Sequence, residues 1–125
     1  GGVYRDQSSF WLAPFESVEF KYTLAEGQSM VFDWRAKSSA AADVIYEMHS
    51  EVDADPEQSV TFELSRGESQ RGTFVAPFDG VHGWYWENRG LEEVEIVLDA
   101  TGFFTHGTTY GPSGAFTKVI AEDAN

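Results

Sequence analysis

Apolar and polar residues alternate with a period of two along most of the chain. Val18, Phe20 and Tyr22 alternate with polar or charged neighbours, a pattern typical of a β-strand with one buried face. Helical periodicity is nearly absent. The alternation predicts short strands over residues 18–24, 30–36, 44–48, 60–64, 73–76, 82–87 and 94–98. About seven or eight short strands at roughly ten-residue spacing predict an all-β protein, an antiparallel β-sandwich or a barrel.

Turn-forming residues separate these predicted strands. The segment 25–28 predicts a tight turn, which would join strands 18–24 and 30–36 into a hairpin. The acidic stretch from Ser50 to Glu57 contains a proline and predicts a loop.

Length and composition indicate a single domain spanning residues 1–125. The chain is 42% hydrophobic and 15% aromatic and contains no cysteine, so a packed core has to form without disulfides or thiolate metal ligands. We expect the core within about residues 16–104. The tail, 105–125, is expected to be an arm or an extra strand.

The charge balance narrows the possible partners. Acidic residues outnumber basic residues by 21 to 8, giving a formal net charge of -13. A surface this negative repels phosphate backbones and anionic lipids, so nucleic acid and bare membrane are poor partners. No apolar run is long enough for a membrane helix. Cations and basic proteins suit the charge, whereas the sequence does not indicate an oligomeric state.

Sequence motifs for catalysis are missing. The chain has no Gly-x-Ser-x-Gly elbow, no His-Glu-x-x-His pair and no phosphate-binding glycine loop. We therefore expect a protein that is not an enzyme.

The histidines are the clearest candidate metal ligands. If the strand ends meet at one end of the sandwich, His49, Glu51 and His82 could converge there. Two imidazoles and a carboxylate would suit zinc or copper(II). The alternative is that each histidine has a structural role and braces a strand end by hydrogen bonding.

The aromatic strand 82–87 allows two interpretations. Trp84 and Trp86 recur with period two, which favours a place in the core, where large side chains bury about 150–250 Å² each. The alternative is a carbohydrate-binding face, on which aromatic rings would stack against sugars. Tyr85 lies on the opposite face of this strand and is the better candidate for such contact.

The segment Thr73–Gly80, followed by His82–Arg89, resembles a bacterial family usually labelled transmembrane anchor proteins. It also resembles the GOLD domain of Golgi cargo receptors, in which a glycine turn precedes an aromatic strand that ends in asparagine. Upstream, Val18–Tyr22, Met30–Trp34 and Met48–Glu51 agree with the same resemblance. The bacterial family usually has a His-Gly-acid motif where this chain has His49, Ser50 and Glu51, so the serine is a departure.

The resemblance implies a compact GOLD-like or jelly-roll-like sandwich on the periplasmic or extracellular side of a membrane. It also implies a transmembrane anchor outside this chain and polar, ligand-capable residues at His49, Glu51 and His82. Two main functions follow as expectations: metal binding at these residues, or a protein-interaction module that holds cargo or a partner subunit. A module of the second kind could accept an extra strand at an open sheet edge, and its partner would be basic.

Overall fold

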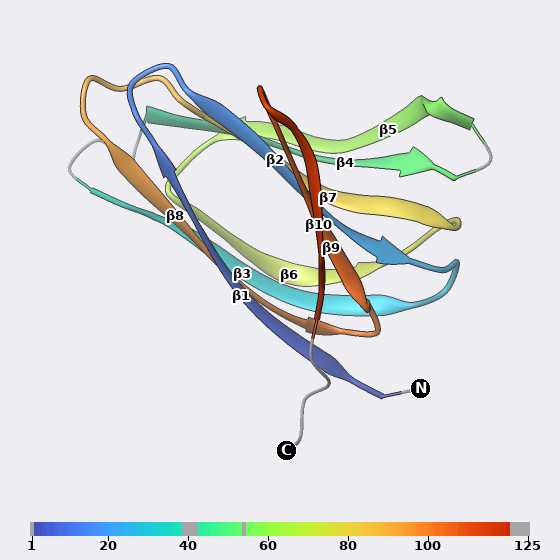
Figure 1. The fold of residues 1–125 in the computed structure, drawn as a ribbon. Helices are drawn as coiled ribbons and strands as arrows, with labels where there is room; N and C mark the ends of the chain where they lie inside the picture. The colour runs from blue at the N-terminus through green and yellow to red at the C-terminus, as the bar shows by residue number, and fades with distance from the viewer. Residues whose placement is uncertain (1, 39–42, 54, 121–125) are drawn as a thin grey trace.

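Ten β-strands form the chain in the computed structural model, which describes residues 2–38, 43–53 and 55–120 (Figure 1). Antiparallel pairing joins them into a four-stranded sheet, in the order β1-β8-β3-β6, and a six-stranded sheet, in the order β10-β9-β2-β7-β4-β5. The strands are β1 (Tyr4–Leu12), β2 (Ser17–Leu24), β3 (Ser29–Lys37), β4 (Val44–Val52), β5 (Asp55–Arg66), β6 (Ser69–Val75), β7 (Gly80–Asn88), β8 (Val94–Gly102), β9 (His106–Gly111) and β10 (Gly114–Val119). The two sheets face each other, which confirms the predicted antiparallel β-sandwich.

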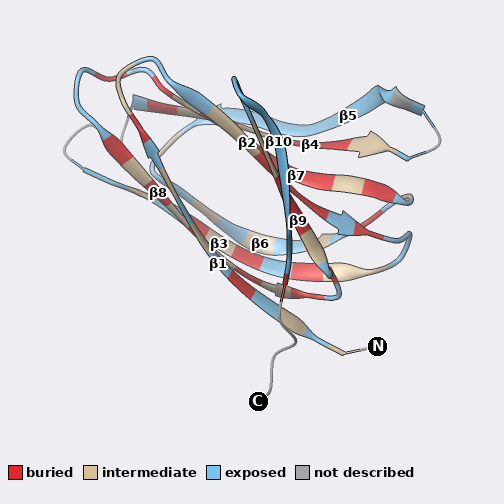
Figure 2. Ribbon diagram, viewed as in Figure 1, coloured by how far each residue is buried: buried red, intermediate tan, exposed pale blue. Residues whose placement is uncertain are grey.

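The core fills the space between the two sheets, and the period-two pattern explains how it forms. Alternate residues of β7 and β8 are buried, so each strand turns one row of side chains inward (Figure 2). Trp34, Trp84 and Trp86 have no exposed surface, and the rings of Trp84 and Trp86 stack with centroids 5.8 Å apart. The tryptophans are core residues, as the alternation predicts. Figure 2 shows β5 and β10, the two edge strands of the six-stranded sheet, largely exposed.

The predicted hairpin between strands 18–24 and 30–36 is wrong. β2 pairs with β7 and β9 in the six-stranded sheet, whereas β3 pairs with β6 and β8 in the four-stranded sheet. The turn between them carries the chain from one sheet to the other. Both strands have one apolar face in either arrangement, so alternation alone does not distinguish a hairpin from a crossover between sheets.

The predicted loop from Ser50 to Glu57 is largely strand. β4 continues to Val52 and β5 begins at Asp55, and these two residues pair across the hairpin. His49 therefore lies well inside β4 rather than at its end. This difference moves the predicted metal ligands from the end of the sandwich to the middle of a sheet.

The two ends of the described chain add strands to both sheets: β1 was not predicted, whereas an arm or an extra strand was expected in the tail. β1 pairs with β8 at the edge of the four-stranded sheet, and the tail supplies the hairpin β9–β10 at the edge of the six-stranded sheet. Lys118 of β10 donates to Asp6 of β1 at 2.7 Å, and Tyr22 donates to the same carboxylate at 2.6 Å. These contacts tie the two sheets together along this edge. No helix among the described residues is long and apolar enough to cross a membrane.

Candidate functional site

Three strands bring a charged cluster together on the outer face of the six-stranded sheet. β2 and β4 both pair with β7, and the register places Lys21 and His49 on either side of Gly83. Because Gly83 has no side chain, the lysine and the imidazole can approach each other across β7. Glu19 and Glu51 point to the same outer face, since outward positions recur at every second residue of a strand.

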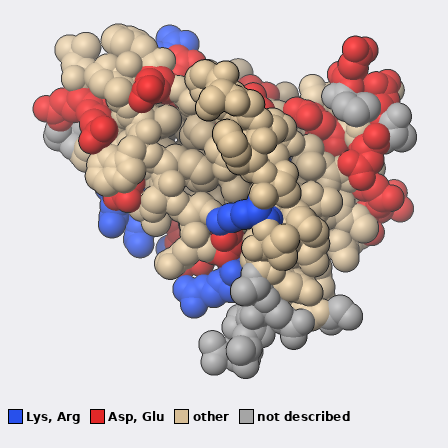
Figure 3. All heavy atoms as spheres, viewed as in Figure 1, with Lys and Arg blue, Asp and Glu red and all other residues tan. Residues whose placement is uncertain are grey.

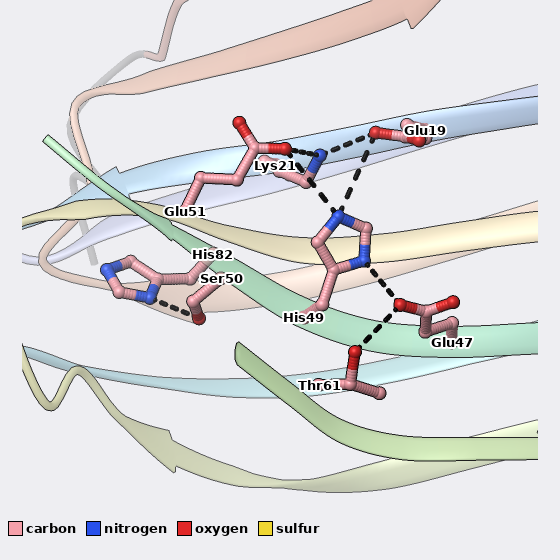
Figure 4. Close-up of polar contacts among 8 residues, drawn as sticks. All are labelled: Glu19, Lys21, Glu47, His49, Ser50, Glu51, Thr61 and His82. Carbon is pink, nitrogen blue, oxygen red and sulfur yellow. Dashed lines mark hydrogen bonds and ion pairs between the residues drawn. The ribbon is translucent and has the colours of Figure 1, made fainter. Parts of the chain in front are cut away.

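The charged groups of this cluster lie within direct reach of one another (Figure 4). Lys21 Nζ is 2.5 Å from Glu19 Oε2 and 3.0 Å from Glu51 Oε1. His49 Nε2 lies 3.9 Å and 3.7 Å from the same two oxygens. The ammonium also sits 4.7 Å from the centre of the Tyr110 ring. We refer to Glu19, Lys21, Glu47, His49 and Glu51 as the histidine–carboxylate cluster.

Glu47 lies on the other side of the imidazole. Glu47 Oε1 lies 3.4 Å from His49 Nδ1 and accepts a hydrogen bond of 3.0 Å from Thr61 of β5. Among the described residues, the buried Nδ1 of His49 makes no hydrogen bond, so its contact with Glu47 is a charge contact. In metal sites, a carboxylate near the second ring nitrogen commonly holds the imidazole once the metal is bound.

Burial controls the charge of His49. The side chain is 10% exposed, and burial lowers the pKa of His49 below its usual value. The neighbouring Lys21 ammonium lowers the pKa further, against the opposing effect of the three glutamates. His49 is therefore neutral near pH 7, which is the form of imidazole that binds metals.

Glu19, His49 and Glu51 form a group that could hold a metal ion. Their ligand atoms all lie within 4.8 Å of one another, and it is the one such group of three or more within the part of the chain that the structure describes. Zinc binds nitrogen and oxygen ligands at about 2.0–2.2 Å, so tetrahedral ligand atoms lie about 3.4 Å apart. The separations of 3.7 and 3.9 Å from His49 Nε2 to the two carboxylates require only small movements.

The structure does not bring His82 to this group. His82 points inward, where Nδ1 lies 2.6 Å from Ser50 Oγ and the ring packs against Phe74 and Phe78. His49 and His82 therefore occupy opposite faces of the six-stranded sheet (Figure 4). Burial lowers the pKa of His82 as well. Of the three predicted ligands, His49 and Glu51 lie together, and Glu19 rather than His82 completes the group.

The aromatic residues proposed for carbohydrate contact have different positions. Trp84 and Trp86 are fully buried and cannot reach a sugar at the surface. Tyr85 lies on the outer face, where its hydroxyl donates to Glu87.

Sequence reasoning missed Glu19, Lys21 and Glu47. A signal was present for all three, because alternation places them opposite the apolar faces of their strands. These residues converge because β2 and β4 pair with opposite edges of β7, and no local sequence pattern indicates that strand order.

A second feature lies on the opposite side of the sandwich. The outer face of the four-stranded sheet has a shallow hollow of about 490 Å³, which includes Asp33 and Asp99 on adjacent strands. Both aspartates are already paired, Asp33 with Arg71 and Asp99 with Arg5, each at 3.2 Å. No histidine lines this hollow.

The fold places the chain among small antiparallel β-sandwich proteins. No protein-family model matches the chain, and no curated protein matches it. One similar solved structure is PliG of Aeromonas hydrophila, a periplasmic lysozyme inhibitor of g-type lysozyme, with a TM-score of 0.56 and 15% identity over 82% of this chain and 89% of that one. Another is the Yersinia pseudotuberculosis-derived mitogen, with a TM-score of 0.58 and 13% identity over 94% of this chain and 97% of that one. Identities this low show a shared fold alone.

Proposed function

We propose that this chain is a non-catalytic, extracytoplasmic binding domain that binds a transition-metal ion, zinc or copper(II), through Glu19, His49 and Glu51. The observation that carries the proposal is the convergence of one neutral imidazole and two carboxylates on the outer face of the six-stranded sheet. Imidazole nitrogen together with carboxylate oxygen suits zinc and copper(II) better than calcium or magnesium, which prefer oxygen ligands alone.

The extracytoplasmic location has two supports. The segments around Thr73–Arg89 resemble membrane-anchored bacterial proteins and GOLD domains, and the structurally similar PliG is periplasmic. The anchor in this proposal lies outside the chain. A non-catalytic role agrees with the lack of catalytic motifs in the sequence.

Thermal unfolding of chelator-treated protein tests the metal proposal. An ion present at 100 times its dissociation constant stabilises a fold by about 2.7 kcal/mol, which would raise the Tm of a domain of this size by several degrees. We expect such a rise with zinc or copper(II) and none with calcium or magnesium. The rise should disappear in His49→Ala and Glu51→Gln.

A matched control is His106→Ala, since His106 lies outside the cluster and contacts the Thr105 hydroxyl. This variant should keep the full metal-dependent rise. An equal loss in all three variants, or no rise with either transition metal in the parent protein, would contradict the proposal.

A second candidate function, a protein-interaction module, has its own observation. β5 is an edge strand with exposed apolar side chains, including Phe62 and Leu64, and acidic side chains gather at the β4–β5 end of the molecule (Figure 3). An unpaired edge can accept a strand from a partner, and the negative charge favours a basic one. PliG, which shares the fold, is an inhibitor of another protein, a g-type lysozyme.

This second candidate predicts a salt-sensitive partner that needs the β5 edge. Pull-downs from membrane extract at low and high salt would compare the parent protein with Leu64→Glu and with Leu91→Glu. Leu64 and Leu91 are both exposed leucines, but Leu91 lies outside the strands. A protein captured at low salt by the parent and by Leu91→Glu, and lost with Leu64→Glu, would support the candidate. If the amount of captured protein changes neither with salt nor with Leu64→Glu, the result would count against the candidate.

A further inference from the structure

Lys21 is buried in an unusual place for a lysine. Its side chain has no exposed surface, although it projects from the outer face of the sheet, where long charged side chains normally reach water. The Tyr110 ring, Glu19 and Glu51 surround the ammonium. The lysine is therefore built into the surface as a fixed cation.

Gly83 makes room for this arrangement. A Cβ at this position would lie 2.1 Å from the carbonyl oxygen of Phe20 and 2.7 Å from Cα of Lys21. β2 and β7 could not approach this closely with any larger residue at position 83. The same missing side chain leaves the space above β7 open to Lys21 and His49.

The ammonium lies among the atoms that would bind a metal ion. Lys21 Nζ contacts Glu19 Oε2 and Glu51 Oε1, and these same two oxygens face His49 Nε2. A divalent cation held by both carboxylates would lie next to the ammonium, and two cations at such a distance repel each other strongly. The lysine and the metal ion therefore compete for the same oxygens.

We propose that Lys21 is the internal counter-ion of this site, and that a metal ion binds by displacing its ammonium from Glu19 and Glu51. The inference rests on the proposed metal-binding function and adds the residue that sets affinity and selectivity. Displacing the ammonium costs every divalent ion about the same. Only an ion that also binds the His49 nitrogen offsets this free-energy cost. The site should therefore bind zinc and copper(II) and not calcium or magnesium.

Removing the charge of Lys21 tests the inference. Isothermal titration of chelator-treated protein with zinc chloride would compare the parent chain with Lys21→Met. We expect the variant to bind zinc at least about tenfold more tightly, because the competing cation is gone. Calcium chloride, without effect on the parent, should then bind measurably.

The matched control is Lys37→Met, which removes the same charge from an exposed lysine at the end of β3, outside the cluster. It corrects for the general effect of a more negative protein and should bind zinc like the parent. Lys21→Gln removes the charge while keeping a donor for the carboxylates, and it replaces Lys21→Met in the comparison should the methionine variant not fold.

Each outcome decides between the two proposals. Zinc binding by the parent that is tighter in Lys21→Met and unchanged in Lys37→Met supports the inference. Equal binding in all three leaves the metal function standing and overturns the role of Lys21. Binding by Lys21→Met alone means that the parent chain is not a metal protein, because its own lysine fills the site. No binding by any variant overturns both proposals.

Discussion

His49 and His82 occupy neighbouring positions on β4 and β7, yet they have opposite surroundings. On the outer face, His49 meets three carboxylates and an ammonium. On the inner face, His82 meets the rings of Phe74 and Phe78 and a single hydroxyl, that of Ser50. Burial lowers both pKa values, but only His49 has groups that could share a cation with it. The comparison teaches that the face of the strand, rather than the residue type, determines what a histidine can do here.

Substitutions of adjacent residues on β7 should show the largest difference between the two faces. Trp84→Ala removes a fully buried inner-face ring and should lower the free energy of unfolding by about 3–5 kcal/mol. Tyr85→Ala, on the outer face, should change it by no more than about 1 kcal/mol. Urea unfolding followed by far-UV circular dichroism measures both. Comparable losses would mean that the outer face contributes to stability as the core does.

Gly83→Ala should disturb both faces at once. The added Cβ would push against the Phe20 carbonyl and the Lys21 backbone, and β2 carries Phe20 inward and Lys21 outward. We expect a loss of about 3 kcal/mol in the free energy of unfolding, together with altered zinc affinity. Gly111→Ala is the control, because a Cβ there meets no atom within 4 Å. A Gly83→Ala protein as stable as Gly111→Ala would show that the close approach of β2 and β7 is not required.

Glu47→Gln should affect only the outer face. Glu47 Oε1 lies 3.4 Å from His49 Nδ1, and in the metal-bound state a carboxylate there would hold the Nδ1 proton better than an amide. We therefore expect zinc affinity to fall by about 10- to 100-fold with little change in stability. Isothermal titration measures the affinity. Glu57→Gln, an exposed acid on β5, removes the same charge and should leave it unchanged. If both variants lose affinity equally, the effect comes from overall charge and not from orientation of the imidazole.

The pH dependence of stability should separate the two histidines more finely. A lowered pKa in the folded state means that the unfolded chain binds more protons below its own histidine pKa, near 6.5. The protein should therefore be most stable above about pH 6.5, and its free energy of unfolding should fall as the pH drops toward 5. For each histidine, the loss is up to about 1.4 kcal/mol per pH unit by which folding lowers its pKa.

Urea titrations between pH 7.5 and 5 would assign this loss. His82 has no exposed surface, and Asp53 opposes the lowering of its pKa, whereas three glutamates oppose the lowering at His49. His82→Gln should therefore flatten the pH dependence more than His49→Gln. A slope that is unchanged in His82→Gln would contradict the assignment.

Much of the fold could be predicted from the sequence, because a strand buried on one face has alternating apolar and polar residues. The alternation in residues 18–24 and 82–87 identified two central strands, and it placed the tryptophans inside. The same alternation puts His82 on the buried face of its strand, with Trp84 and Trp86. It puts His49 on the face of its strand that lies opposite the buried side chain of Met48. The sequence pattern alone thus indicated that the two histidines lie on opposite faces. The predicted metal site at the strand ends was wrong in placing them together.

The remaining features depend on contacts between distant segments. Glu19 and Glu51 meet because β2 and β4 pair with opposite sides of β7, and that order is a property of the whole sheet. β1 and β9 are rich in small and polar residues, so their alternation is weak. Their place in the sheets depends on the partners β8 and β2.

The bond between Lys118 and Asp6 has a consequence for the order of folding. The two residues lie 112 positions apart, and this side-chain bond bridges strands that belong to different sheets. A contact between such distant segments requires a long loop to close, and the entropy lost in closing it is not offset until the contact has formed. Such contacts therefore tend to form slowly. We expect the hairpin β9–β10 to dock after the central strands have assembled and to be the first to detach. Amide hydrogens of β10 should then exchange with solvent sooner than those of β7.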